Sequence, residues 1–224
     1  MHTTDVARTG HPTARAWWAV AAAAVVLALL TWAVTAGWTP LLRTDRALSE
    51  ALYAGDGRGR PVEWALQVAT APGSAAVRAV VLLPVLAWLA MRAAWRTAAW
   101  VLLAGALVGP LTTLLKETIG RLRPQFAEGG ARLESLSFPS GHASGIATLV
   151  TVVLVLAWPL LAPSARRVWL AAGVVLAVLV GLTRMWLGVH YLSDVLGGWA
   201  LGTGWVLLTA LAFGALPGGR AALR

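Results

Sequence analysis

The sequence predicts an all-α, polytopic membrane protein with six transmembrane helices in one bundle. Three observations lead to this fold class. The chain of 224 residues is 58% hydrophobic, only 12% of it is charged, and a soluble domain usually carries about 25% charged residues. Its apolar residues fall into six runs, each near the length of about 20 residues with which a helix crosses a bilayer. No convincing internal repeat or separate polar domain interrupts them, so residues 1–224 are expected to form a single membrane-embedded domain.

The six spans follow one another along the whole chain. We expect them at residues 16–38, 74–91, 97–115, 141–161, 167–187 and 195–216. Several tryptophans lie near these ends, where amphipathic rings prefer the membrane interface. The first span could instead be a cleaved signal peptide, because Val34 and Ala36 weakly resemble a cleavage site. Its apolar run exceeds the usual 7–15 residues, roughly, of such a peptide, which favours a permanent anchor.

Two long polar connections separate the spans, at residues 39–73 and 116–140. Within the first connection, residues 44–53 and 61–69 have apolar side chains at helical spacing. These segments are expected to be short interfacial helices on the membrane surface. A plain solvated connector explains the same composition equally well.

The composition excludes several functional classes. The chain has no cysteine, which rules out disulfides, thiolate metal sites and cysteine nucleophiles. Its formal charge of +9 raises the question of nucleic acid, but the basic residues are scattered at membrane faces. Anchoring beside anionic lipid headgroups accounts for them better. The expected surroundings are therefore the lipid bilayer, with no nucleic-acid partner.

The arginines favour one orientation. Six spans place both termini, as tails 1–15 and 217–224, on the side of the loops near residues 92–96 and 162–167. That side has eight basic residues and the other side has ten, so the raw count does not decide. Four of the ten lie in the polar segments described next: Lys116, Arg123, Arg184 and, less securely, Arg121. Discounting them predicts cytoplasmic tails in a cell membrane and long loops on the extracytoplasmic face.

Three short segments on the predicted outer side concentrate the polar side chains. They are residues 116–124 (KETIGRLRP), residues 139–142 (PSGH) and residues 183–194 (TRMWLGVHYLSD). Charged groups at membrane spans are costly and usually functional. The first and third segments supply three cations, Lys116, Arg123 and Arg184, suited to a phosphate group. In the second, Ser140 and Gly141 lie at a helix N-terminus, where free backbone amides attract anions.

Two histidines complete this set. His190 and Asp194 are four residues apart and therefore share a helical face. A carboxylate there can hold the proton of one ring nitrogen and leave the other free for nucleophilic attack. His142 suits the role of general acid, because an unperturbed histidine has a pKa of about 6.5.

The three segments resemble the signature of the type 2 phosphatidic-acid phosphatase superfamily: K-x6-R-P, then P-S-G-H, then S-R-x5-H-x3-D. Every spacing within each motif agrees, and only Thr183 departs, standing where the family commonly has serine. The resemblance implies that His190 is the nucleophile, Asp194 its orienting acid and His142 the leaving-group acid. It further implies a phosphate-binding set and no metal or other cofactor. That set comprises Lys116, Arg123, Ser140, Gly141 and Arg184.

Other notable residues have plainer interpretations. Arg121 is expected to be a solvated neighbour and is left out of the site. Arg78 could touch a substrate headgroup, but a side chain that snorkels to the interface is more common. His2 and His11 are expected to be interfacial or packing residues. Three Gly-x3-Gly pairs permit close helix contact, more within one bundle than between two copies. They begin at Gly105, Gly141 and Gly198.

The expected activity is therefore hydrolysis of a lipid phosphate or pyrophosphate through a phosphohistidine. Candidate substrates include undecaprenyl pyrophosphate, phosphatidylglycerol phosphate and phosphatidic acid, among which the residues do not discriminate. A non-catalytic binder or transporter of lipid phosphates is the alternative, but it would predict the loss of His142, His190 or Asp194. A vanadate-holding haloperoxidase shares the three motifs, and the six spans argue against it.

Overall fold

The computed structural model describes residues 12–127 and 134–221. These residues form eight α-helices and two short 3-10 helices, and no strand occurs among them. The all-α prediction is thus confirmed, whereas His2 and His11 lie outside the described residues. The helices are α1 (Pro12–Thr35), α2 (Thr39–Leu52), α3 (Gly59–Thr70), α4 (Ala75–Met91), α5 (Trp95–Ile119), α6 (Gly141–Ala157), α7 (Pro163–Trp186) and α8 (Leu192–Phe213).

The predicted membrane spans correspond to helices α1, α4, α5, α6, α7 and α8. Five of these are long and apolar enough to cross a membrane, all except α4. Helix α4 meets that test together with α3 and the 3-10 turn η1 (Ala71–Gly73), as a pair bent by 44°. Counting this pair as one broken span gives six crossings. The protein is a multi-span membrane protein.

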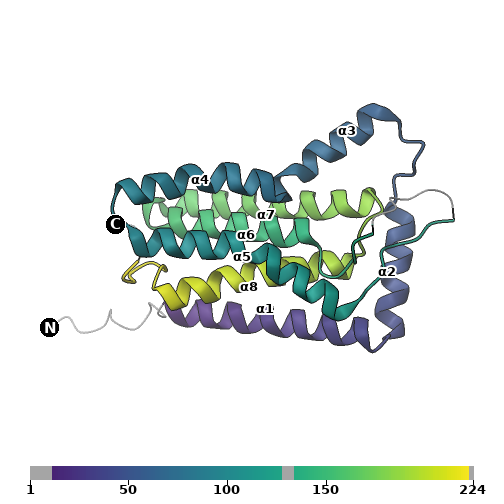
Figure 1. Ribbon diagram of the computed structural model, residues 1–224, viewed down its shortest axis with the longest axis horizontal. Coiled ribbons are helices and arrows are strands. Elements are labelled where there is room, and N and C mark those ends of the chain that lie inside the picture. The colour runs from purple at the N-terminus through teal and green to yellow at the C-terminus, as the bar shows by residue number, and fades with distance from the viewer. Residues whose placement is uncertain (1–11, 128–133, 222–224) are drawn as a thin grey trace.

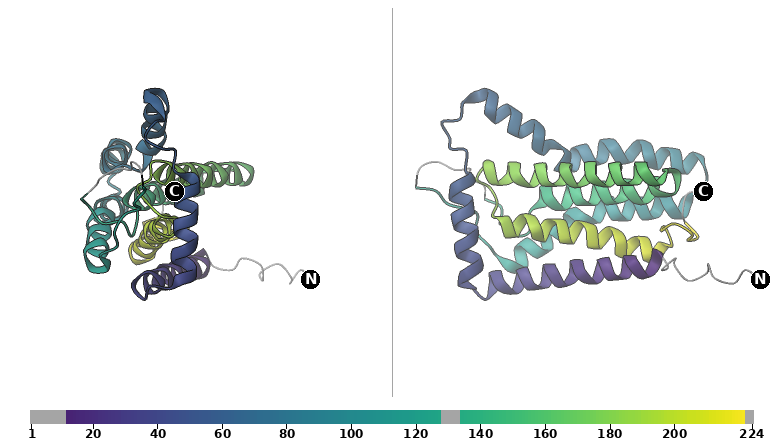
Figure 2. Two further views of the ribbon diagram at one scale, coloured as in Figure 1. Left: turned by 90° about the vertical axis from the view of Figure 1, so that its right-hand side faces the viewer. Right: turned by 180° about the vertical axis from the view of Figure 1, so that it is seen from behind.

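The long helices lie side by side, and the start of α1 and the end of α8 lie at one end of the bundle (Figure 1). Helix α8 contacts α6, α1 and α5, and α6 also contacts α5 and α7. Helix α1 packs chiefly on α8 at the edge of the bundle. At the opposite end, α2 runs across the end of the bundle, and α3 projects outward beyond α4 (Figures 1 and 2).

Helices α6 and α8 are in close backbone contact. A Cβ atom built on Gly198 would lie 2.6 Å from the backbone oxygen of Ser140, and one on Gly202 would lie 2.4 Å from that of Ser144. A Cβ atom built on Gly109, by contrast, would meet no atom of another described element within 4 Å. The Gly198-x3-Gly202 pair therefore serves packing inside the bundle, as expected. The pair that begins at Gly105 does not bring two backbones together.

The first long connection is helical rather than an irregular connector. Leu48 and Leu52 of α2 pack against a buried cluster of Ala143, Met185 and Val195. This contact holds α2 on the end of the bundle. Helix α3 leaves apolar side chains exposed, with 70% of Trp64 accessible. Each helix covers most of one segment that the sequence predicts to be helical.

Candidate active site

The first motif lies where α5 ends. Lys116 is in the last turn of this helix, which Gly120 terminates with a positive φ of 71°. A residue with a side chain rarely adopts that conformation, so glycine suits the position. The Lys116 Nζ atom donates to the backbone oxygens of Leu136 and, at 3.3 Å, Ser137. Lys116 thereby ties α5 to the segment that leads into α6.

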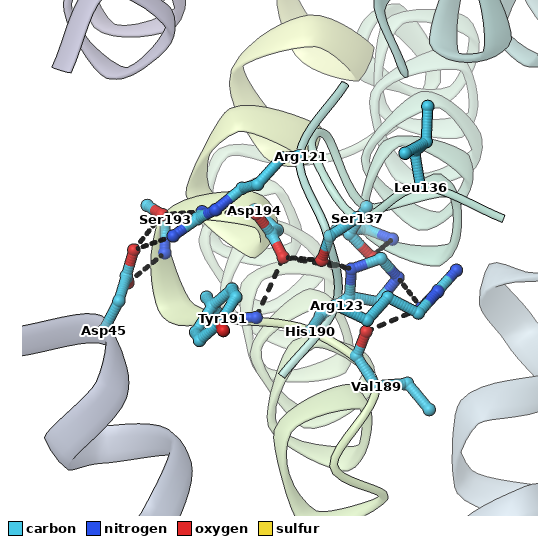
Figure 3. Close-up of polar contacts among 12 residues, drawn as sticks. Asp45, Arg121, Arg123, Leu136, Ser137, Val189, His190, Tyr191, Ser193 and Asp194 are labelled. Carbon is cyan, nitrogen blue, oxygen red and sulfur yellow. Dashed lines mark hydrogen bonds and ion pairs between the residues drawn. The ribbon is translucent and has the colours of Figure 1, made fainter. Parts of the chain in front are cut away.

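Arg123 joins two loops. Its NH1 atom donates to the backbone oxygen of Val189 at 2.6 Å, and its Nε atom donates to that of Ser135 at 2.7 Å. The same NH1 atom lies 3.3 Å from Nε2 of His190. The guanidinium group therefore faces the ring nitrogen that the sequence predicts to be nucleophilic (Figure 3).

The second motif forms the start of α6. The Ser140 side chain accepts a hydrogen bond from the Ala143 amide at 3.5 Å and so caps the helix. Its own amide donates to the backbone oxygen of Asp194 at 2.9 Å, which fixes α6 against α8. The N-terminus of α6, with its free amides and positive dipole end, consequently lies beside the third motif.

His142 lies in the first turn of α6 and is partly buried. It is near enough to four cations for their charges to act on it: Arg184, Arg123, Arg78 and Lys116. Arg184 itself is buried in the last turn of α7, where its NH1 atom donates to Thr70 at 3.3 Å. Its Nε atom has no hydrogen-bond partner among the described residues. The predicted cations therefore converge, and Arg184 keeps a free donor.

The third motif brings His190 and Asp194 together, but not on one helical face as the sequence predicts, because His190 lies in the loop before α8, which begins at Leu192. The Nδ1 atom of His190 lies 3.3 Å from Oδ2 of Asp194, and both residues are buried. A carboxylate oxygen only accepts, so Nδ1 carries the proton and Nε2 presents its lone pair. Burial lowers the pKa of His190 to about 3, outweighing the opposite effect of its hydrogen bond to Asp194. His190 is therefore neutral at physiological pH, as a nucleophile must be.

Thr183, the one departure from the family pattern, is fully buried. Its hydroxyl donates to the backbone oxygen of Val180 at 2.6 Å, within its own helix. Serine can make the same bond.

Two polar residues near Asp194, Ser137 and Asp45, are not predicted from the sequence, and the expectation for Arg121 is wrong. Arg121 is not a solvated neighbour: its side chain is only 8% exposed and its NH1 atom lies 2.6 Å from Oδ1 of Asp194. Ser137 donates to Oδ2 of Asp194, and Asp45 of α2 pairs with Arg121 at 2.7 Å. The available signals were a charged residue inside the K-x6-R-P spacing and an acid, Asp45, within the first predicted interfacial helix.

Arg78 also differs from its expected role. The residue is 8% exposed, and its Nε atom donates to the backbone oxygen of Gly105 at 3.1 Å. A buried guanidinium held by a neighbouring helix does not snorkel to the interface.

Comparison with known proteins identifies the family. Residues 94–216, more than half of the chain, match the model of the PAP2 superfamily. The protein belongs to this superfamily. The matched region contains all three motifs, and the resemblance seen in the sequence is confirmed.

A solved PAP2 structure has the same fold. The transmembrane PAP2-type phosphatidylglycerolphosphate phosphatase from Bacillus subtilis superimposes with a TM-score of 0.64 at 29% sequence identity. The alignment covers 83% of this chain and 92% of that one.

Curated relatives include three kinds of phosphatase. Phosphatidylglycerophosphatase B of Bacillus subtilis (strain 168) is 46% identical over 95 residues, 41% of this chain and 46% of the relative. Lipid A 1-phosphatase of Rhizobium johnstonii is 37% identical, over 47% of this chain and 43% of the relative. Undecaprenyl-diphosphatase of Sulfolobus acidocaldarius is 39% identical, over 31% and 30% respectively. The chain thus spans less than half the length of each of these curated relatives.

Proposed function

We propose that this PAP2 protein is a membrane phosphatase that hydrolyses the phosphomonoester or pyrophosphate of a lipid through a phosphohistidine on His190. The observation that carries this proposal is the two-sided environment of His190. Its Nδ1 atom faces the buried carboxylate of Asp194, while its Nε2 atom faces the cation Arg123. A neutral imidazole with one nitrogen anchored and the other directed at a cationic pocket is arranged to attack a bound phosphoryl group.

The phosphate-binding role falls to Lys116, Arg123, Arg184 and the N-terminus of α6 at Ser140 and Gly141. Phosphoryl transfer requires little covalent chemistry from a protein, so positioning and charge stabilisation dominate its catalysis. The Nε atom of Arg184 has no hydrogen-bond partner among the described residues, so it supplies a donor for a phosphate oxygen. The hydrogen bond between Arg123 and His190 gives way as the phosphoryl group enters between them.

The reaction then proceeds in two displacements. Nε2 of His190 forms a bond to phosphorus as the bond to the lipid oxygen breaks, and His142 gives its proton to that oxygen. Water next attacks the phosphorus of the phosphohistidine and gives a proton to His142. The bond between phosphorus and Nε2 breaks, and inorganic phosphate leaves. Asp194 keeps the Nδ1 proton in place and stabilises the positive charge on the ring of His190 during both steps.

A panel of lipids tests this function. The purified full chain should release phosphate from at least one of undecaprenyl pyrophosphate, phosphatidylglycerol phosphate and phosphatidic acid presented in liposomes. Activity should survive EDTA, because the described residues contain no group of three or more His, Asp or Glu side chains that could hold a metal ion. Vanadate should inhibit it, since the site is built for a phosphate-like anion.

Two outcomes would contradict the proposal. If the wild type releases no more phosphate from any lipid than His190→Ala does, the result would favour the binder or transporter. Loss of activity in EDTA with recovery in magnesium would show that a metal ion supplies the charge assigned here to the three cations.

We further propose that the site works on the extracytoplasmic face of the cell membrane. It lies at the end of the bundle opposite the described ends of the chain (Figure 1), and the basic residues predict that the termini are cytoplasmic. A lipid would keep its chain in the bilayer while its phosphate meets the cations. Short water-soluble esters should be poor substrates, since they forgo burial of about 0.8 kcal/mol per methylene.

Cysteine labelling tests the orientation, because the natural chain has no cysteine. Ala127→Cys and Ser164→Cys place single thiols at exposed positions near opposite ends of the bundle. An impermeant maleimide should label the first variant in intact cells and the second only after lysis. The reverse pattern would place the site in the cytoplasm.

A further inference from the structure

A buried ionic network connects the first outer connection to the His190–Asp194 pair. Its outermost member is Asp45 of α2, whose side chain is 2% exposed. The Asp45 carboxylate accepts from the backbone amide of Ser193 at 3.0 Å and from Arg121 at 2.7 Å. Because Ser193 is in the first turn of α8, Asp45 caps this helix from a position 148 residues away in the sequence.

Arg121 is the centre of the network (Figure 3). Its NH2 atom is bonded to Asp45, and its NH1 atom is bonded to Oδ1 of Asp194 at 2.6 Å and to the hydroxyl of Ser193 at 2.6 Å. The ring of Tyr191 lies 4.2 Å from the guanidinium carbon on one face. One planar cation thus joins two buried carboxylates, a geometry that an ammonium group cannot reproduce.

The two oxygens of Asp194 have different partners. Oδ1 is bonded to Arg121, whereas Oδ2 accepts from Ser137, from the Tyr191 amide at 2.9 Å and from Nδ1 of His190 at 3.3 Å. Every contact on Oδ1 and Oδ2 restricts rotation of the carboxylate. Arg121 is the residue that holds Oδ1 away from His190, while Ser137 and the Tyr191 amide hold Oδ2.

We propose that Arg121 and Asp45 are positioning residues of the phosphatase: Arg121 fixes the carboxylate of Asp194 against His190, and Asp45 shares the charge of Arg121 so that Asp194 retains its own. This inference rests on the proposed function of His190 as nucleophile. It gives α2 a part in the reaction, although the proposed phosphate-binding set includes no residue of α2.

The two residues have opposite electrostatic effects on Asp194. Without Arg121, the carboxylates of Asp194 and Asp45 lose their shared counter-charge. The negative charge of Asp194 then stabilises the protonated, positively charged form of His190. Without the charge of Asp45, Arg121 pairs with Asp194 alone and weakens the hold of Asp194 on the Nδ1 proton. The other charged groups that act on His190, Arg123 and Lys116, stay the same in both cases.

Arg121→Gln and Asp45→Asn test the proposal in the full chain in detergent, labelled with [15N]histidine. Loss of a signal in His190→Ala assigns the resonances of His190. In the wild type His190 should remain neutral, with the proton on Nδ1, from pH 8 down to pH 5. In Arg121→Gln it should take up a proton within this range. In Asp45→Asn it should stay neutral while the Nδ1 resonance shifts toward that of a weaker hydrogen bond.

Kinetics supply the second readout. Both variants should lower kcat by about 10- to 100-fold, the usual effect of losing a partner that orients a histidine ligand or carboxylate. KM should stay within about threefold, because neither residue touches the substrate in the proposed mechanism. Asp45→Asn keeps the acceptor for the Ser193 amide, so it decides the proposal by itself if Arg121→Gln does not fold.

Arg58→Gln is the matched control. It breaks another ion pair of the same outer connection, that between Arg58 and Glu63 at 2.5 Å, which is separate from Asp194. This control should match the wild type in kcat and in the His190 spectrum. Unchanged His190 spectra in both test variants would overturn the positioning role, whatever happens to activity. If the wild type releases no phosphate from any lipid, the proposed function fails, and the spectra still decide the positioning role.

Discussion

Replacement of His190 by alanine should abolish phosphate release, with a loss of kcat of at least about 1000-fold. Among the described residues, His190 has the only imidazole ring with one nitrogen facing a buried carboxylate and the other facing the cation cluster, and the substitution removes this ring. In the wild type, acid-sensitive phosphate should be found on His190 after a rapid quench in base, where phosphohistidine survives. The adduct should be absent from the variant.

Two comparisons sharpen this test. His142→Ala should still form the adduct, but more slowly for lipids with poor leaving groups, because it removes the proposed proton donor. His11→Ala, which removes a histidine from the N-terminal segment, should leave turnover unchanged. Full activity in His190→Ala, or an adduct on another residue, would refute the assignment of the nucleophile.

Gly202→Val should prevent stable folding, and even Gly202→Ala should lower the melting temperature clearly. A Cβ atom at this position would lie 2.4 Å from the backbone oxygen of Ser144 and 3.0 Å from the Thr148 amide. Because backbone atoms of α6 have nowhere to move, α6 and α8 must separate. Overpacking of this kind costs about 1–3 kcal/mol, occasionally more. Thermal unfolding in detergent, followed by tryptophan fluorescence, measures the effect.

Activity should fall along with stability, since α6 carries His142 and α8 carries Asp194. Gly109→Ala is the matched control: Gly109 is also inside a transmembrane helix, but no atom lies within 4 Å of a Cβ atom built there. That variant should melt at or above the temperature of the wild type. If Gly202→Ala also melts at or above the temperature of the wild type, the close packing of α6 and α8 does not depend on this glycine.

The spans could be located from the sequence because a helix that crosses lipid requires a long run of apolar residues. Helix ends were harder. The third span was expected to end at residue 115, yet α5 continues to Ile119. Hydropathy measures contact with lipid, and the last turn of α5, with Lys116 and Glu117, is polar while still helical. Gly120, in its left-handed conformation, was the better sign of the helix end.

In the candidate site, too, some residues could be predicted from the sequence and others could not. Motif spacing located the His190–Asp194 pair, but the expected shared helical face is not the reason for their contact. His190 precedes α8, and the chain entering the N-terminus of α8 brings its ring to Asp194. Arg121 could not be judged by such a local rule. Its burial depends on Asp45, which is 76 residues away and meets it only after α2 folds across the end of the bundle. An isolated charge next to apolar sequence looks solvated until its partner is known.

The Nε atom of Arg184, which has no hydrogen-bond partner among the described residues, has a consequence for the stability of the protein during purification. Arg184, Arg123 and Lys116 are held close enough to act on one another's charge, and such repulsion weakens the empty folded state. An anion that binds only to the folded chain adds stability in proportion to RT ln(1 + [L]/Kd). Phosphate or vanadate should thus protect the protein during extraction from the membrane, and anion-free buffers should leave it in its most fragile form.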